Sequence, residues 1–157
     1  MTNKTLTVLG AGSWGTALSL VLADNGHDVR LWSYHKEQAE KINQTKMNEN
    51  YLPDILLPET IIAYHDLEEA IKNCEIIIVA VPTKAVREVM KKLLNYIKNP
   101  VTIVHVCKGI EPGSLKRVSE IIKEEVPEYL LKDIVVLSGP SHAEEVSLRH
   151  PTTVAVA

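Results

Sequence analysis

Three glycines near the amino terminus are spaced in a way that suits a ligand carrying phosphate groups. Gly10, Gly12 and Gly15 form the pattern G-x-G-x-x-G within LTVLGAGSWGTALS. In such a turn the first glycine allows a sharp bend, the second lets the backbone approach a pyrophosphate, and the third lets a helix pack closely on a strand. The amides of Ser13 and Trp14 would face the phosphates from the positive end of the helix. The alternative is a glycine-rich turn without a ligand.

The segments around the glycines fit a strand, a helix and a second strand in succession. An apolar strand is predicted over Thr5–Leu9, a helix over Trp14–Asn25 and a second strand over Asp28–Trp32. A G-x-G-x-x-G pattern in this position is typical of a dinucleotide-binding fold, with the pyrophosphate at the start of the helix. The sequence therefore predicts that NADP or NAD binds here.

The residues after the second strand bear on the choice between these two dinucleotides. Folds that require NAD carry Asp or Glu at this point, where it binds the 2′-hydroxyl of the adenosine ribose. Here the chain reads Ser33, Tyr34, His35 and Lys36. No carboxylate would repel the 2′-phosphate of NADP, and Lys36 with His35 would attract it. NADP is therefore permitted; the alternative is a solvated turn with ordinary residues at a helix start.

Three more segments follow predicted strands, at the edge where ligands bind in an open α/β sheet. Pro82 and Thr83 would wall the nicotinamide side. Lys108 follows a buried strand and would either extend into the cleft, which we favour, or lie along the surface. Gly139 and Ser141 turn into a short helix, whose free amides and serine hydroxyl would bind an anion or a polar substrate. A plain helix cap is the alternative there.

Short apolar segments alternate with segments of helical periodicity, as in a parallel sheet covered by helices on both faces. The predicted fold class is α/β: a doubly wound, mostly parallel sheet of the Rossmann type in three layers. The predicted strands are Thr5–Leu9, Asp28–Trp32, Thr60–Tyr64, Glu75–Ala80, Val101–Cys107 and Ile134–Leu137. The predicted helices are Trp14–Asn25, Lys36–Thr45, Leu67–Asn73, Lys84–Tyr96 and Leu115–Glu125. An ordered loop is predicted over Gln44–Thr60, and HPTTVAVA at the end is interpreted as the start of another strand.

Composition and charge exclude several classes of protein. The chain has 157 residues, a net charge of −3, no run of Lys or Arg and no apolar stretch long enough to cross a bilayer, so neither nucleic acid nor membrane is an expected partner. The amino terminus lacks the regions of a signal peptide, and we expect a cytoplasmic location. Cys74 and Cys107 are expected to be free thiols. No histidine has the spacing of a metal ligand, and His105 is predicted to be a core histidine with satisfied hydrogen bonds.

Several segments together resemble the NAD(P)-dependent glycerol-3-phosphate dehydrogenases of the bacterial type. They are VLGAGSWGTALS, NYLPDILLP, IIIVAVPT, CKGIE, SGPSHAEEV and PTTVAVA, in the order and at the spacing of the family. The resemblance covers essentially the whole chain. It implies an oxidoreductase that interconverts sn-glycerol 3-phosphate and dihydroxyacetone phosphate by hydride transfer with NAD(P)H, feeding glycerophospholipid synthesis. A homodimer of the full-length protein is a further expectation.

The resemblance also implies which residues touch each ligand. The cofactor-binding residues would be Gly10, Gly12, Ser13, Trp14, Gly15, Tyr34, His35, Tyr51, Lys108 and Ala143. The substrate-binding residues would be Lys108, Gly139 and Ser141. Among them, Tyr51 looks like the residue that closes over the cofactor. The family often has arginine near Tyr34, and its absence here weakens the expectation of a strict preference for NADP.

Residues 1–157 are interpreted as an N-terminal NAD(P)-binding domain, truncated near its end. The resemblance places the lysine that donates and accepts the proton in a C-terminal helical substrate domain beyond this chain, so no catalytic residue is expected within it. We therefore expect dinucleotide binding with little or no turnover. The alternatives are a related dehydrogenase of the ketopantoate or 6-phosphogluconate type, against which Trp14, NYLPD and SGPS argue, and a non-catalytic module that senses dinucleotides.

Overall fold

The structure is a computed structural model that describes residues 3–157, so the first two residues of the predicted domain lie outside it. Its strands are β1 (Thr5–Leu9), β2 (Asp28–Trp32), β3 (Met47–Asn48), β4 (Leu52–Leu56), β5 (Ile61–Tyr64), β6 (Ile76–Val79), β7 (Val101–His105), β8 (Leu131–Ser138) and β9 (Ala155–Val156). Its α-helices are α1 (Ser13–Asp24), α2 (Lys36–Thr45), α3 (Leu67–Ile71), α4 (Val86–Leu94), α5 (Val118–Glu125) and α6 (Ala143–Ser147). Two short 3₁₀ helices, η1 (Thr83–Ala85) and η2 (Glu128–Leu130), precede α4 and β8.

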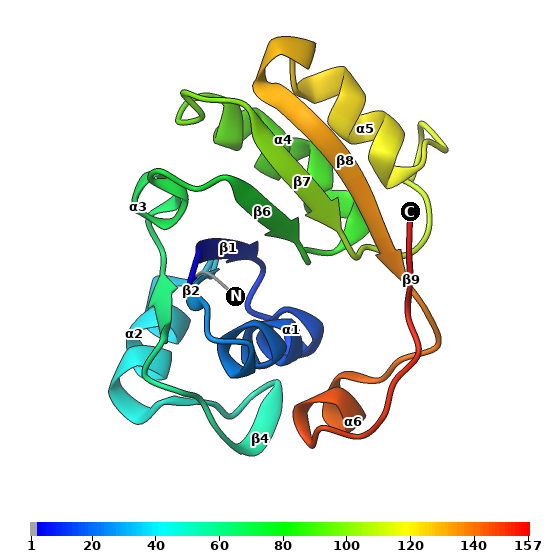
Figure 1. Ribbon diagram of the computed structural model, residues 1–157. Helices are drawn as coiled ribbons and strands as arrows, with labels where there is room; N and C mark the ends of the chain where they lie inside the picture. The colour runs from blue at the N-terminus through cyan, green and yellow to red at the C-terminus, as the bar shows by residue number, and fades with distance from the viewer. Residues whose placement is uncertain (1–2) are drawn as a thin grey trace.

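One large sheet runs through the molecule in the order β5-β2-β1-β6-β7-β8-β9 (Figure 1). Every neighbouring pair from β5 to β8 is parallel, and only β9 pairs antiparallel with β8. The chain starts in the middle with β1, fills one side through β2 and β5, and then crosses to fill the other side. This is the doubly wound order of a Rossmann-type sheet. The predicted fold class is confirmed, and HPTTVAVA does contribute a strand.

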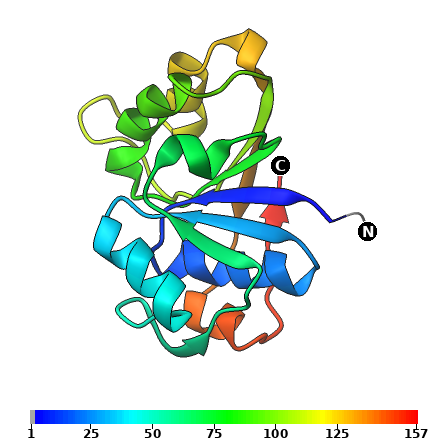
Figure 2. The same ribbon diagram turned by 90° about the vertical axis from the view of Figure 1, so that its left-hand side faces the viewer.

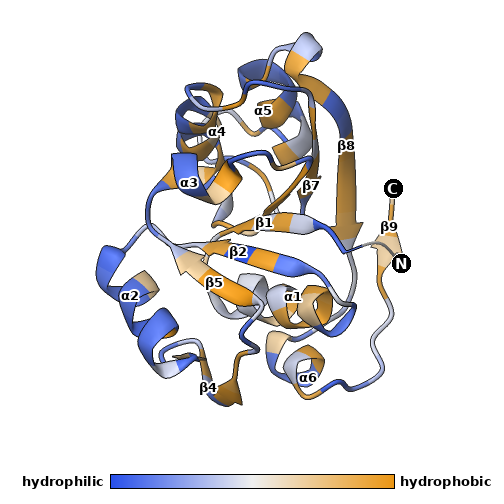
Figure 3. Cartoon of the chain, turned by 60° about the vertical axis from the view of Figure 1, so that its left-hand side comes forward, coloured by the Kyte–Doolittle hydropathy of each residue, from blue (hydrophilic) through white to orange (hydrophobic). Residues whose placement is uncertain are grey.

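Helices cover both faces of the sheet (Figure 2). On one face α1 and α2 pack around Val8 and Leu31. On the other, α3, α4 and α5 pack around Leu9, Ile77 and Ile103. Figure 3 shows the apolar strands lying between helices whose outer sides are polar. Burying each such side chain fully stabilises the fold by about 1.5–3 kcal/mol, which explains why strands covered on both faces are apolar throughout.

The prediction of a loop over Gln44–Thr60 was wrong, because this segment contains a small antiparallel ribbon. β3 pairs with β4 through an irregular register. Pro53 lies within β4, and Asp54 has a φ of +63°. Proline is tolerated in such a ribbon because its missing N–H can face away from the partner strand. The short pairing and the proline leave no alternating pattern in the sequence.

Several predicted boundaries also need correction. The helix predicted from Leu115 begins at Val118, because Leu115 has a φ of +59° and cannot be helical. The helix predicted from Lys84 opens as the 3₁₀ turn η1 before α4 begins. β8 is longer than predicted and starts at Leu131, whereas β7 ends at His105, two residues earlier than predicted. The remaining differences are one or two residues at the ends of elements.

Cys74 and Cys107 are free thiols, as predicted. Within residues 3–157 no helix is long and apolar enough to span a membrane. The same residues contain no group of His, Cys, Asp or Glu side chains arranged to hold a metal ion.

Candidate functional site

A cavity of about 640 Å³ opens at the carboxyl ends of the central strands. Its walls come from the segments that follow β1, β2, β6, β7 and β8, together with the turn between β3 and β4. The residues predicted to contact cofactor or substrate that line it are Gly10, Gly12, Ser13, Trp14, Tyr34, His35, Tyr51, Lys108, Ser141 and Ala143. Gly15 and Gly139 are not part of its surface. The sheet thus brings together residues from six distant parts of the sequence.

The three glycines of the turn meet three different surroundings. A Cβ on Gly10 would lie 2.7 Å from the Ala80 carbonyl oxygen, and the φ of Gly10 is +116°. A Cβ on Gly15 would lie 1.9 Å from the Gly10 carbonyl oxygen, so α1 can approach the turn only if this residue has no side chain. A Cβ on Gly12 would meet nothing within 4 Å. The turn is therefore closely packed on two sides and open to the cavity at Gly12.

The amino terminus of α1 faces this opening. Gly12 is its N-cap residue, no side chain caps it, and its first turn contains no acidic residue. The first amides of a helix have no partner within the helix and carry its positive partial charge. The Ser13 hydroxyl does not cap the helix but donates to the Tyr51 carbonyl oxygen at 2.9 Å, tying the β3–β4 ribbon to the glycine turn. The helix start is therefore free to receive an anion.

A buried polar network that the sequence analysis missed holds the backbone of the glycine turn at Ala11. The Gln38 amide donates to the Ala11 carbonyl oxygen at 2.7 Å and accepts from the Ser33 hydroxyl at 2.5 Å. The Asn48 amide donates to the same Ala11 oxygen at 3.0 Å and to the Thr16 hydroxyl at 2.8 Å. Ser33 and Asn48 are buried. Neither Gln38 nor Asn48 belongs to a pattern in the sequence, because α2 and the β3–β4 ribbon bring them here.

The end of β2 carries aromatic and basic groups. Tyr34 lies edge-on to Trp32 and His35, and the Nζ of Lys92 from α4 is 5.1 Å from the centre of the Tyr34 ring. Lys36, which the sequence suggested as an attractor of phosphate, is not on the cavity surface, and its Nζ is 3.7 Å from a Glu40 carboxylate oxygen. Glu144 is the single carboxylate among the described residues that line the cavity.

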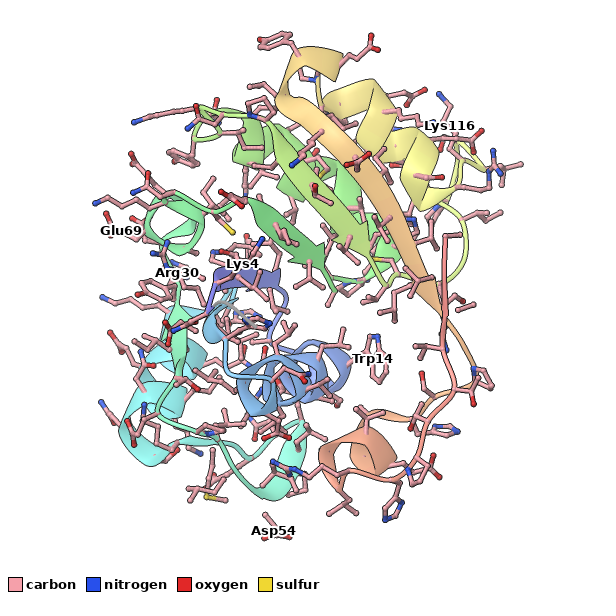
Figure 4. All side chains as sticks on the ribbon, viewed as in Figure 1. Lys4, Trp14, Arg30, Asp54, Glu69 and Lys116 are labelled. Carbon is pink, nitrogen blue, oxygen red and sulfur yellow. The ribbon has the colours of Figure 1, made fainter. Side chains whose placement is uncertain are left out.

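Trp14 belongs both to the cavity and to the contact of α1 with the C-terminal segment. Its ring projects from the start of α1 toward that segment (Figure 4). A second, mostly apolar hollow of about 340 Å³ lies beyond it, between α1, α6 and β8. Across the same contact, the Arg149 guanidinium bridges both oxygens of Asp24, at 3.0 and 3.1 Å. A small residue in place of Trp14 would leave this contact and the cavity wall incomplete.

Lys108 projects toward β8 at the far side of the cavity. Its backbone carbonyl accepts a hydrogen bond from the Thr83 hydroxyl at 2.8 Å, and its Nζ donates to the Gly139 carbonyl oxygen at 3.2 Å. Thr83 therefore positions Lys108. Thr83 itself is not on the cavity surface, although it was predicted to wall the nicotinamide side. Pro82 does line the cavity, as predicted for the wall of this side. Gly139 leaves room for the returning chain, since a Cβ there would lie 2.7 Å from the Thr153 carbonyl oxygen.

The surroundings of the Cys107 thiol make it unreactive. Cys107 lines the cavity and its Sγ donates to the Val81 carbonyl oxygen at 3.1 Å. Burial raises the pKa of this thiol to about 11. At neutral pH Cys107 is therefore a protonated donor that links the ends of β6 and β7, and is a poor nucleophile.

The segment after Lys108 is anchored by an ion cluster that the sequence did not reveal. The Arg87 guanidinium, on α4, forms two parallel 2.8 Å hydrogen bonds with the Glu111 carboxylate. It also contacts Glu125 and Glu124 of α5. The Arg87 bonds, with a smaller contribution from the Ser114 hydroxyl, lower the pKa of Glu111 to about 2. Three separate segments supply the guanidinium and its carboxylates, so no local spacing could predict the cluster.

His105 differs from its prediction. It is buried at the end of β7, but neither ring nitrogen has a hydrogen-bond partner among the described residues. Burial lowers the pKa of His105, so it is neutral near physiological pH. The expectation of satisfied hydrogen bonds was therefore wrong, because the side chain faces the apolar layer that α4 and α5 form.

Comparisons with known proteins agree with this geometry. Residues 5–157 match a family model described as NAD-dependent glycerol-3-phosphate dehydrogenase N-terminus. A glycerol-3-phosphate dehydrogenase [NAD(P)+] of Geobacillus thermodenitrificans is 63% identical over 98% of this chain, and one of Bacillus anthracis is 58% identical over 95%. In both cases the match covers 44% of the relative. The chain thus spans less than half the length of these relatives.

Solved structures show the same relationship. A glycerol-3-phosphate dehydrogenase from Coxiella burnetii superposes with a TM-score of 0.89 at 37% identity, covering 98% of this chain and 46% of that one. The enzyme from Saccharomyces cerevisiae superposes with a TM-score of 0.86 at 30% identity, covering 99% of this chain and 47% of that one. By sequence and by structure, the chain belongs to the NAD-dependent glycerol-3-phosphate dehydrogenase family of oxidoreductases, of which it is the N-terminal, NAD(P)-binding part.

Proposed function

We propose that this cavity binds NADP or NAD with the pyrophosphate over Gly12 and the start of α1. The main support is that the uncapped, positive end of a twelve-residue helix opens into the cavity at the one glycine of the turn whose Cβ position is empty. The residues present fit the group, because free amides suit phosphate oxygens and no side chain blocks their approach. No protein carboxylate lies in the glycine turn.

The sheet order orients the two halves of the dinucleotide in this proposal. The adenosine lies over the end of β2, beside Tyr34 and His35, and the nicotinamide lies over the ends of β6 and β7, beside Pro82 and Lys108. Bound there, the nicotinamide supplies the hydride. Tyr51 covers the pyrophosphate from the β3–β4 ribbon, which the Ser13 hydroxyl holds in place.

For the whole protein we propose the interconversion of sn-glycerol 3-phosphate and dihydroxyacetone phosphate. In this part of it, Lys108 and Ser141 contact the substrate beside the nicotinamide, and Ala143 contacts the cofactor. The Lys108 ammonium, now held by the Gly139 carbonyl oxygen, is a hydrogen-bond donor that can turn to a polar substrate. A further helical domain supplies the lysine that transfers the proton, because reduction of a carbonyl needs a proton donor at its oxygen.

The proposal extends to the surroundings in which the protein works. The two free thiols support a reducing compartment, the cytoplasm. The net charge of −3 supports a small-molecule partner and neither nucleic acid nor membrane. We also propose that the whole protein forms a homodimer.

The test is a titration of the chain with NADPH and with NADH, followed by energy transfer from tryptophan to the reduced nicotinamide. Both tryptophans of the chain, Trp14 and Trp32, line the cavity. Wild type should bind at least one dinucleotide saturably. Gly12→Val should remain folded, since its side chain enters open space, but should lose binding because it occupies the place of the pyrophosphate.

The control variant is Lys132→Met. Lys132 lies in a separate hollow at the amino ends of the strands, so this variant should bind like wild type. Circular dichroism and thermal unfolding establish that each variant is folded. Binding by Gly12→Val as tight as wild type would refute the placement of the pyrophosphate. A folded wild-type chain that binds neither dinucleotide would refute the proposed function.

A further inference from the structure

The peptide between Ala11 and Gly12 is held from one side by two side-chain amides. The Ala11 carbonyl oxygen accepts from the Gln38 amide at 2.7 Å and from the Asn48 amide at 3.0 Å. The Gln38 amide also donates to the Asn48 side-chain oxygen at 3.2 Å, so the two side chains hold each other in place. Asn48 is only 3% exposed and does not line the cavity. Any effect of Asn48 on a ligand must therefore act through the turn.

These two hydrogen bonds fix the direction of the Gly12 N–H. A peptide unit is planar and trans, so its C=O and its N–H point in opposite directions. Because the Ala11 oxygen faces the buried amides, the Gly12 N–H faces the other way, toward the cavity that Gly12 lines. Among residues 3–157 no backbone oxygen accepts a hydrogen bond from this N–H. The Gly12 N–H is therefore a free donor with a fixed direction.

Asn48 also acts on the peptide that follows Gly12. The same Asn48 nitrogen donates to the Thr16 hydroxyl at 2.8 Å, and that hydroxyl donates to the Gly12 carbonyl oxygen at 2.7 Å. By the same geometry, the Ser13 N–H points away from this network. One buried side chain thus contributes to the orientation of both peptides that flank Gly12.

The backbone of Asn48 joins the network to the β3–β4 ribbon. The Asn48 carbonyl oxygen accepts from the Tyr51 N–H at 3.0 Å, and the Tyr51 carbonyl oxygen accepts from the Ser13 hydroxyl at 2.9 Å. The ribbon is therefore attached to the turn at Ala11 and at Ser13, on either side of Gly12. A turn held in this way loses less conformational freedom when a ligand binds, which favours tight binding.

We propose that Asn48, together with Gln38, is a positioning residue that aims the Gly12 N–H at the pyrophosphate. The inference rests on the proposed dinucleotide function and adds to it a buried residue that acts without touching the ligand. Removal of the Asn48 amide frees the Ala11–Gly12 peptide to rotate, so binding weakens although every residue on the cavity surface is kept. The effect is the same for NADPH and NADH, because both carry the same pyrophosphate.

The experiment compares Asn48→Ala with Asn43→Ala in titrations with NADPH and with NADH. Asn43 is a matched control, because its side chain donates to the Ala63 carbonyl oxygen and accepts from the Ala63 N–H, both at 2.8 Å, and it does not line the cavity. Asn48→Ala should weaken the binding of both dinucleotides by about tenfold, as expected for the loss of one hydrogen bond to a charged group. Asn43→Ala should bind both like wild type.

A spectroscopic readout separates positioning from a general loss of stability. In amide NMR spectra, a hydrogen bond to phosphate moves an amide proton downfield. The Gly12 amide proton should move downfield when wild type or Asn43→Ala is saturated with NADH, and should move clearly less in Asn48→Ala. Gln38→Met removes the other donor to the Ala11 oxygen from a partly exposed position, and it should reduce the same shift.

The outcomes separate the inference from the function on which it rests. A folded Asn48→Ala with wild-type affinity, or with the full shift at Gly12, would overturn the inference and leave dinucleotide binding intact. An equal loss in Asn43→Ala would also overturn it, because general loosening of the fold would then explain the effect. If Asn48→Ala does not fold, the full shift at Gly12 in Gln38→Met overturns the inference. A wild-type chain that binds neither dinucleotide would overturn both proposals together.

Discussion

Gly12 and Gly15 lie in the same turn, three residues apart, but they restrict the chain for different reasons. The space at Gly12 is open and, in the proposed function, receives the pyrophosphate, whereas the space at Gly15 is filled by the backbone of Gly10. In the proposed function, Gly12 therefore serves binding, and Gly15 serves folding. Mutations at the two positions should separate these roles.

We expect Gly15→Ala to lower the free energy of unfolding by about 2 kcal/mol or more, because its Cβ would lie 1.9 Å from a backbone oxygen that cannot move alone. Gly12→Ala should cost no more than about 1 kcal/mol, the loss of a good N-cap residue. Urea unfolding followed by circular dichroism measures both. Equal stabilities of the two variants would contradict this account of the turn.

At the scale of elements, α4 and α5 hold the segment that carries Lys108. The Arg87 guanidinium ties Glu111, three residues after Lys108, to the carboxyl end of α5. The Glu111 side chain is only 12% exposed. Arg30 plays a similar part on the other side, where it donates to the Lys72 carbonyl oxygen at 2.6 Å and to that of Glu69 at 3.2 Å, at the end of α3 (Figure 4). Arg87 thus fastens the loop that carries Lys108 to the cavity, whereas Arg30 fastens the end of α3, which does not line the cavity.

The Arg87 cluster predicts a specific acid sensitivity. The pKa of Glu111 is lowered to about 2 from an ordinary 4.5, so its ionised form stabilises the fold fully above pH 4.5. This stabilisation is lost as the pH falls through about 2. The unfolding free energy of wild type should therefore fall more steeply over this range than that of Glu111→Gln, measured by urea unfolding at several pH values. Parallel pH profiles of the two proteins would refute the assignment.

The elements that sequence alone predicted well are those whose pattern repeats. The strands of the large sheet are apolar over several residues, and α1, α2 and α4 keep helical periodicity. The β3–β4 ribbon was missed because Pro53 and a two-residue strand leave no repeat. The cavity was predicted because ligands bind at strand ends and the residues there are polar or glycine. Gln38 and Arg87 were missed because only the packing of separate helices gives them partners.

At the scale of the molecule, the proposed function assigns the cavity to a dinucleotide and gives this chain two substrate contacts, Lys108 and Ser141. We expect the 157-residue chain to bind NADPH or NADH but to oxidise little or none of it when dihydroxyacetone phosphate is added. The reason is that Lys108 alone is a poor proton donor beside the nicotinamide. The measurement is the absorbance of the reduced nicotinamide over time. Turnover comparable to that of a typical enzyme would show that the chain contains its own proton donor.

β1 is the first strand in the chain and lies in the middle of the sheet, and this affects the order in which the site is assembled during synthesis. Because synthesis proceeds from the amino terminus, the glycine turn leaves the ribosome before the segments that pack around it. Ala80, whose carbonyl lies close to Gly10, is made later, and Ser141 and Ala143 follow later still. A nascent chain released partway through would hold the first half of a nucleotide site with no opposite wall. In the proposed function, dinucleotide binding therefore requires residues that are made well after the glycine motif.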